Sequence, residues 1–170
     1  MLRHTVRAEV GHGLGPLEVL RRLNAAMLRD PAAEPARFAT VAHAHLEVAA
    51  DGVTVRLVNA GHVPALVLRG DRVETVGEPG TLLGVYSDLT LTEAVVHLGR
   101  GDLLVLYTDG ITEARGMHDW YGPERLTALL GSLAGSDAGA VADAVLAEVL
   151  AFQDGAPRDD IALLVLGGAR

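Results

Sequence analysis

The stretch LLVLYTDGITE, residues 103–113, joins a continuous apolar run to two carboxylates. The apolar run, residues 103–108, does not alternate with polar residues, so it predicts a strand that is buried on both faces. Asp109 and Glu113 follow where that strand reaches solvent. A carboxylate at the end of a buried strand is costly unless it is hydrated, paired or bound to a metal. This stretch therefore predicts an inner strand of a sheet and marks its carboxyl end as a candidate site.

A second acidic cluster, Arg158-Asp159-Asp160-Ile161, precedes the last apolar run of the chain, residues 161–166. Adjacent like charges raise the pKa of one carboxyl group unless a cation relieves the repulsion. The chain has no cysteine, and oxygen-only ligands suit Mg²⁺ or Mn²⁺ better than a metal that prefers thiolates. Alternatively, Asp109-Gly110 is a simple turn and Asp159-Asp160 a solvated loop. The spacing alone leaves both interpretations open.

Three further patterns predict structure rather than chemistry. Arg100-Gly101-Asp102 precedes the buried run and is typical of a turn. His43 and His45 would share one face of a strand, which permits a metal pair but favours a half-exposed face. Gly11-His12-Gly13 is rich in glycine, but no apolar strand precedes it, so it does not indicate a phosphate-binding loop.

The first half of the chain predicts one helix followed by antiparallel strands. Gly15-Pro16 starts a helix over residues 16–28, because proline at the first helical position loses no needed hydrogen bond. Residues 1–10 are a candidate for an earlier helix, and residues 30–35 break the helical pattern. Short connections make neighbouring strands antiparallel, and Asp51-Gly52 is a strong hairpin signal. The expected strands cover residues 38–48, 53–58, 65–68 and 73–76.

The second half predicts a loop over residues 77–90, a strand over 91–98, the buried strand, two helices and a final strand over 161–166. The two helices are indicated by apolar stripes at helical spacing. These stripes are Leu126, Leu129, Leu130 and Leu133, then Val141, Val145, Val149 and Phe152. Strands, a helix pair and a strand imply an α+β fold of layered sheets and helices.

Length and composition exclude several classes of protein. At about 100–200 residues per domain, 170 residues predict one domain. The net charge of −8 argues against a surface for nucleic acid or for anionic membrane. The absence of cysteine excludes disulfides, thiolate zinc sites and a cysteine nucleophile. The sequence has no run of about 18–20 apolar residues, and we expect a cytoplasmic protein.

Seven motifs in order resemble the metal-dependent protein serine/threonine phosphatases of the PPM family, in the bacterial SpoIIE-like branch tied to sporulation and stress-response regulation. They are Pro16-Leu17-Glu18-Val19-Leu20 with Leu23-Asn24; Arg37-Phe38-Ala39-Thr40; Asn59-Ala60-Gly61-His62-Val63-Pro64; Gly80-Thr81-Leu82-Leu83-Gly84; Gly101-Asp102 with residues 106–114; Tyr121-Gly122 with Arg125-Leu126; and Asp159-Asp160-Ile161-Ala162. Each motif alone is weak, whereas their order along the whole chain is specific.

The resemblance implies a layered α-β-β-α sandwich of mainly antiparallel sheets with flanking helices. It implies two or more Mn²⁺ or Mg²⁺ ions and a metal-activated water that attacks phosphoserine or phosphothreonine without a phospho-enzyme. Asp109 and Asp159 match metal ligands of the family. Glu113, Asp160 and Gly110 are candidates to hold an additional metal or to orient the ligands, and no catalytic side chain beyond the metal ligands is implied. His62 belongs to a motif that we interpret as structural.

The sequence departs from the family at its N-terminus. Relatives begin with strands and an Asp-Val-Ser-Gly-His-Gly motif that supplies the bridging aspartate, and neither is present here. Glu9-Val10-Gly11-His12-Gly13 resembles that motif but lies a full helix too late. We therefore expect residues 1–170 to form a single, N-terminally incomplete phosphatase domain with an incomplete ligand set and weak metal affinity. Bare sheet edges would then favour a dimer or low stability.

The resemblance favours a phosphatase whose substrate is a phosphorylated protein, such as an anti-anti-sigma factor, with no role for nucleic acid or membrane. An alternative is a catalytically impaired phosphatase-fold module that binds a regulatory partner, such as a switch-protein kinase or an anti-sigma factor. A third is the inert product of a truncated gene. The sequence does not name the substrate.

Overall fold

The computed structural model describes residues 13–29, 38–153 and 159–168, which form two compact units. The first unit takes the described residues up to Glu47, with 54–64 and 77–96. The second takes 48–53, 65–76 and the described residues from His97 onward. The predicted helix over residues 1–10 and the predicted break at 30–35 lie outside the described residues.

Helix α2 (Pro16–Arg29) confirms the helix predicted from Gly15-Pro16. The Val19 N–H donates to the Gly15 carbonyl at 3.1 Å, which closes the first turn. Its apolar face packs on strand β2 (Gly52–Ala60) and on the loop that carries Leu83. The buried cluster that results is Leu20, Leu23, Val58, Ala60 and Leu83.

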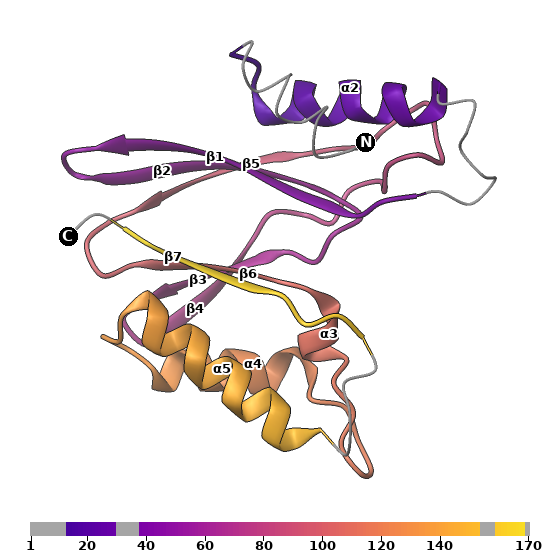
Figure 1. The fold of residues 1–170 in the computed structure, drawn as a ribbon. Coiled ribbons are helices and arrows are strands. Elements are labelled where there is room, and N and C mark those ends of the chain that lie inside the picture. The colour runs from indigo at the N-terminus through magenta and orange to yellow at the C-terminus, as the bar shows by residue number, and fades with distance from the viewer. Residues whose placement is uncertain (1–12, 30–37, 154–158, 169–170) are drawn as a thin grey trace. The chain divides into compact units, whose positions relative to one another are not determined.

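Strands β1 (Val41–Ala49), β2 and β5 (Glu93–Leu98) form a three-stranded sheet in the order β1-β2-β5 (Figure 1). The predicted hairpin at Asp51-Gly52 is confirmed, since β1 ends at Ala49 and β2 begins at Gly52. The predicted strand start at Phe38 is wrong by three residues. Ala39 instead makes an isolated antiparallel bridge with Leu83, whose backbone exchanges hydrogen bonds of 3.0 and 2.9 Å with it.

The second sheet has the order β4-β3-β6-β7 and consists of β3 (Ala65–Arg69), β4 (Arg72–Val76), β6 (Leu103–Tyr107) and β7 (Leu163–Gly167). The pairings β3–β4, β3–β6 and β6–β7 are all antiparallel. In β6, Val105 lies opposite Leu66 of β3 and Val165 of β7. Four of the five β6 residues are buried, which confirms the prediction from the apolar run.

Helices α4 (Gly122–Ser132) and α5 (Ala138–Phe152) cover one face of this second sheet, and α5 contacts β7 while α4 contacts β4 (Figure 1). Their buried positions follow the predicted stripes: Leu126 and Leu130, then Val141, Val145 and Val149. The short helix α3 (Asp109–Thr112) was not predicted. The α+β class, with antiparallel sheets and flanking helices, is thus confirmed.

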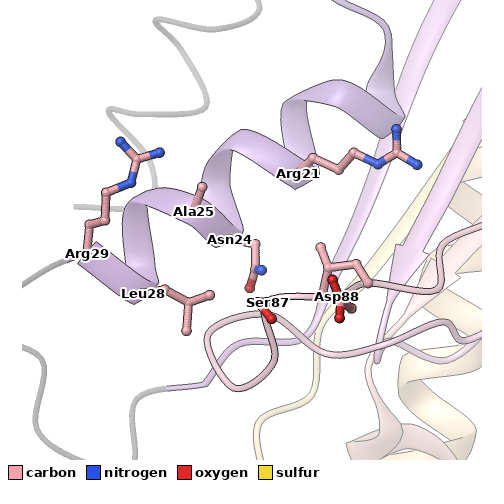
Figure 2. Close-up of a pocket in the computed structure, with 8 residues that line it drawn as sticks. Arg21, Asn24, Ala25, Leu28, Arg29, Ser87 and Asp88 are labelled. Carbon is pink, nitrogen blue, oxygen red and sulfur yellow. The ribbon is translucent and has the colours of Figure 1, made fainter.

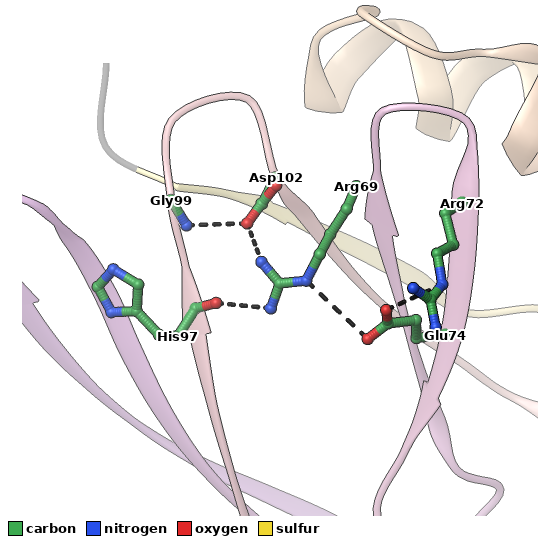
Figure 3. Close-up of polar contacts among 6 residues, drawn as sticks. All are labelled: Arg69, Arg72, Glu74, His97, Gly99 and Asp102. Carbon is green, nitrogen blue, oxygen red and sulfur yellow. Dashed lines mark hydrogen bonds and ion pairs between the residues drawn. The ribbon is translucent and has the colours of Figure 1, made fainter.

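Arg69 ties β3 to the turn between β5 and β6 (Figure 3). Its guanidinium pairs with the Asp102 carboxylate and donates to the His97 carbonyl at 2.7 Å. The same Asp102 oxygen accepts the Gly99 N–H at 2.9 Å, so it closes the turn as well. Asp102 is therefore a structural residue, as the turn interpretation of residues 100–102 predicts. No helix in the described ranges is long and apolar enough to cross a membrane.

Candidate functional site

Thr108 joins the end of β6 to the chain that enters β7. Its N–H donates to the Ala162 carbonyl at 3.0 Å. Its hydroxyl donates to the Asp160 carbonyl at 2.8 Å and accepts the Ala162 N–H at 2.9 Å. One side chain thereby satisfies two backbone groups of a segment that lies 52 residues further along the chain. The two acidic clusters predicted from sequence are brought together by these bonds.

Gly110 contacts the same segment even more closely. A Cβ atom at position 110 would lie 2.5 Å from the Asp160 carbonyl oxygen and 3.0 Å from its carbonyl carbon. Gly110 is buried, whereas Asp109 on one side of it is exposed. The backbone contact therefore requires glycine here. It sets Asp109 at the rim of the junction between residues 108–110 and 159–162.

The carboxylates at this junction face solvent. Asp109 is the first residue of α3, and the Glu113 N–H donates to its carbonyl at 2.7 Å, so Glu113 follows one helical turn later. Asp159 is exposed, and its Oδ1 accepts the Asp160 N–H at 2.7 Å. Burial raises the pKa of the Tyr107 phenol above its ordinary value, which keeps the residue before Thr108 uncharged. The negative charge of this region therefore resides on the carboxylates.

Comparison with known proteins assigns the chain to a family. The family model described as "Stage II sporulation protein E (SpoIIE)" matches residues 1–167. The chain belongs to the SpoIIE family. The resemblance expected from the seven motifs is therefore confirmed.

The SpoIIE-family chain is similar to proteins named as phosphatases. The phosphoserine phosphatase RsbU of Bacillus subtilis (strain 168) is 25% identical over 168 residues, which are 98% of this chain and 49% of RsbU. The chain thus spans about half the length of this curated relative.

Two solved structures share the fold. The SiaA-PP2C domain of Pseudomonas aeruginosa superposes with a TM-score of 0.71 at 23% identity, covering 98% of this chain and 68% of that one. The PPM Ser-Thr phosphatase MsPP from Mycobacterium smegmatis, in complex with cacodylate, superposes with a TM-score of 0.72 at 15% identity. The match covers 98% of this chain and 79% of MsPP.

The junction of the SpoIIE-family chain offers donors suited to a hard divalent cation, because Asp109 and Asp159 present exposed carboxylate oxygens. The Gly110 contact holds the two carrying segments together without any side chain between them. Within the described part of the chain, no three His, Cys, Asp or Glu side chains gather as a metal site. The donor chemistry of Asp109 and Asp159 therefore fits Mn²⁺ or Mg²⁺, but the described residues bring fewer than three such ligands together.

Three of the described histidines make local contacts of their own. His43 lies in β1, and its pKa is lowered by burial and by neighbouring His45. His45 Nε2 lies 3.8 Å from Glu47 Oε1 of the same strand. His62 Nδ1 lies 3.0 Å from the Val63 carbonyl oxygen, in the bend after β2. This contact fits the structural role expected for His62.

A separate pocket of about 530 Å³ lies between α2 and the loop over residues 86–89 (Figure 2). Asn24 points from α2 toward that loop and is buried. Its amide donates to the Tyr86 carbonyl and accepts the Gly84 N–H, both at 2.8 Å. Arg21 and Arg29 project in different directions from α2 (Figure 2), so the cations of this pocket do not converge on one ligand.

Sequence reasoning missed two residues that build these sites. The apolar run predicts Thr108 only as the end of a strand, although its hydroxyl organises the junction. The sequence presents Asn24 only as part of a motif, although it links α2 to a loop some 60 residues away. A polar residue within an apolar stripe was the available signal for Asn24, because a buried amide must find partners.

Proposed function

We propose that the chain is the phosphatase domain of a bacterial signalling protein and that it hydrolyses phosphoserine or phosphothreonine in a protein substrate. The observation that supports this best is the junction itself. Thr108 and Gly110 bind the backbone of Asp160 and Ala162, and they hold Asp109 and Asp159 on adjacent segments. The match of the SpoIIE family over residues 1–167 and the phosphatase names of the relatives point to the same chemistry.

In this proposal Asp109 and Asp159 would hold Mn²⁺ or Mg²⁺. Such an ion, when bound, acts as a Lewis acid on a phosphoryl oxygen and lowers the pKa of a bound water. The side chains supply the negative charge that holds the cation, and the Thr108 hydroxyl keeps their segments in register. Glu113 and Asp160 would hold an additional ion or orient the ligands. In this hydrolysis the water oxygen would bond to phosphorus, the bond between phosphorus and the seryl or threonyl oxygen would break, and a proton from the water would pass to that oxygen. The products are the free hydroxyl side chain and inorganic phosphate.

The proposal includes weak metal binding, because the described residues contain no group of three or more His, Cys, Asp or Glu side chains that could hold an ion. The name of the phosphoserine phosphatase RsbU supports a phosphoserine substrate, and a phosphorylated anti-anti-sigma factor is the candidate protein that we favour. Dimerisation through an exposed edge such as β7, where Leu164 is 52% exposed, belongs to the same proposal.

The test is hydrolysis of p-nitrophenyl phosphate and of a phosphoserine peptide in the presence of Mn²⁺. We expect Asp109→Asn and Asp159→Asn each to lower the rate at least about a hundredfold, because each removes a charged ligand. Asp71→Asn, an exposed aspartate in the β3–β4 turn, is the matched control and should retain the parent rate.

Equal rates in the parent and in both ligand variants would overturn the metal assignment. A folded parent with no hydrolysis at any Mn²⁺ concentration would favour the alternative, a phosphatase-fold module that binds a regulatory partner. Calorimetric titration with Mn²⁺ separates these cases, since the first proposal requires binding that depends on Asp109 and Asp159. Tight binding at two sites would contradict the weak affinity proposed here.

A further inference from the structure

A short hairpin begins at the residue after Glu113. The Tyr121 N–H donates to the Ala114 carbonyl at 2.8 Å, and the Gly116 N–H donates to the Asp119 carbonyl at 2.9 Å. Arg115 and Trp120 form an antiparallel bridge between these bonds. We call residues 114–121 the 114–121 hairpin. It is continuous with α3, because the Ala114 N–H donates to the Ile111 carbonyl at 3.3 Å.

The base of the 114–121 hairpin is fixed to helix α5. Tyr121 is 1% exposed, and its hydroxyl donates to Glu148 Oε1 at 2.8 Å. Its ring meets Phe152 edge-on, with centroids 5.4 Å apart. A Cβ on Gly116 would lie 3.0 Å from the Phe152 ring, so the hairpin backbone also rests on that ring. Burial and the Glu148 contact raise the pKa of Tyr121, so it remains a hydrogen-bond donor.

Arg125 of α4 fixes the second strand of the hairpin. Its guanidinium donates to the Trp120 carbonyl at 2.5 Å and to the Tyr121 carbonyl at 3.1 Å. It also pairs with the Asp119 carboxylate at 2.7 Å and stacks over Phe152 at 4.8 Å. Arg125 and Asp119 thus form an ion pair with each other, and the second strand of the hairpin is tied to α4.

The outer surface of the hairpin, by contrast, carries exposed apolar side chains and an arginine without an acidic partner among the described residues. Met117 is 74% exposed and Trp120 is 47% exposed. The Arg115 guanidinium stacks over the Trp120 ring at 4.3 Å. Within the described part of the chain no carboxylate is paired with Arg115. Stacking holds the guanidinium plane in place and leaves its N–H edges free for a bidentate anion.

We propose that the 114–121 hairpin docks the segment of the protein substrate that flanks the phosphorylated residue, with Arg115 binding an acidic side chain and Met117 and Trp120 binding an apolar one. This inference rests on the proposed function, because the hairpin starts next to Glu113 at the junction of Asp109 and Asp159. Charge complementarity decides the occupant. Arg115 is the cation of the hairpin that has no acidic partner, whereas Arg125 is already neutralised by Asp119.

Trp120 is the only tryptophan of the chain, so its fluorescence reports docking directly. The experiment titrates the full chain, in EDTA, with a phosphoserine peptide that carries flanking Asp and Leu residues. A second peptide replaces Asp by Asn. We expect a saturable change in Trp120 emission and a Kd about fivefold to tenfold lower for the acidic peptide, as one charge-assisted contact would give.

Variants locate the effect. Arg115→Ala should remove the preference for the acidic peptide, and Arg115→Lys should restore part of it, since lysine keeps the charge but not the planar fork. Arg100→Ala, an exposed arginine in the turn before β6, is the control and should bind like the parent. With Mn²⁺, Arg115→Ala should also raise KM for the acidic peptide about tenfold more than for p-nitrophenyl phosphate. Circular dichroism confirms that each variant is folded.

Equal affinity of the parent for both peptides would overturn docking, as would equal binding by Arg115→Ala and Arg100→Ala. Hydrolysis of the peptide without any change in Trp120 emission would contradict docking but would agree with the phosphatase proposal. Saturable, Arg115-dependent binding without hydrolysis would support docking and contradict the phosphatase proposal. The two failures are therefore distinguishable.

Discussion

Gly110 packs so closely on Asp160 that a Cβ atom at position 110 would lie 2.5 Å from the Asp160 carbonyl oxygen. Real Cβ atoms essentially never approach a neighbouring atom this closely, and the obstacle is backbone rather than a movable side chain. The two acidic segments can meet only if position 110 lacks a side chain. A steric requirement in the backbone thereby controls where Asp109 lies relative to residues 159–162.

Gly110→Ala should push the two segments apart. We expect a loss of about 1–3 kcal/mol in the free energy of unfolding, the usual cost of overpacking a tight contact. Mn²⁺ affinity should fall with it, since Asp109 moves away from Asp159. Chemical denaturation and calorimetric titration measure the two effects. Gly167→Ala in β7 is the control, because its Cβ would meet Leu103 at an ordinary 3.6 Å. Equal losses in both variants would contradict a specific role for the Gly110 contact.

Thr108→Val removes the hydroxyl and preserves the shape of the side chain. The Ala162 N–H then loses its acceptor and the Asp160 carbonyl its donor. A loss of about 1–3 kcal/mol is expected, the cost of leaving polar groups without partners. Thr108→Ser keeps the hydroxyl and should recover most of the stability. If thermal unfolding places Thr108→Val and Thr108→Ser at the same midpoint, the hydroxyl does not organise the junction.

Much of the second sheet can be predicted from the sequence, because short local patterns determine its turns and its buried strand. The β3–β4 pairing follows from a tight turn at Gly70-Asp71, and a tight turn permits only an antiparallel neighbour. The buried state of β6 follows from its unbroken apolar run. Helix α3 escaped prediction because a helix of four residues is too short to show a period.

The sequence predicts the acidic residues of the junction but not the contacts that bring them together. The acidic residues at 109 and 159 stand out in the sequence, but no local pattern says that Thr108 will bond to a residue 52 positions away. The start of β1 was misplaced for a similar reason. Phe38 and its neighbours have the composition of a strand, yet Ala39 pairs with Leu83 of a distant loop. Tertiary contacts decide such cases against local propensity.

Asn24→Ala should destabilise the first unit. The Asn24 side chain is 3% exposed, and it joins α2 to the Tyr86 carbonyl and the Gly84 N–H. Both backbone groups lose their partner in the variant, so we expect a loss of about 1–3 kcal/mol in the free energy of unfolding. Ala25→Ser, one residue along the same helix, is the control. Hydrogen exchange at Gly84 should accelerate in Asn24→Ala, and unchanged protection there would refute the bridging role.

His43 should make stability depend on pH below neutrality. Burial, together with the neighbouring His45, lowers its pKa in the folded state from the ordinary 6.5. Between the two pKa values the unfolded chain binds more protons than the folded chain, so the free energy of unfolding rises with pH. This contribution of His43 to the free energy of unfolding is fully present above pH 6.5 and is lost as the pH falls through the lowered folded-state pKa.

His43→Gln cannot titrate, and it should therefore flatten the pH dependence of the free energy of unfolding, measured by urea denaturation between pH 5 and 7. His118→Gln, an exposed residue, should retain the slope of the parent. Parallel profiles for the parent and His43→Gln would show that another group governs the acid sensitivity.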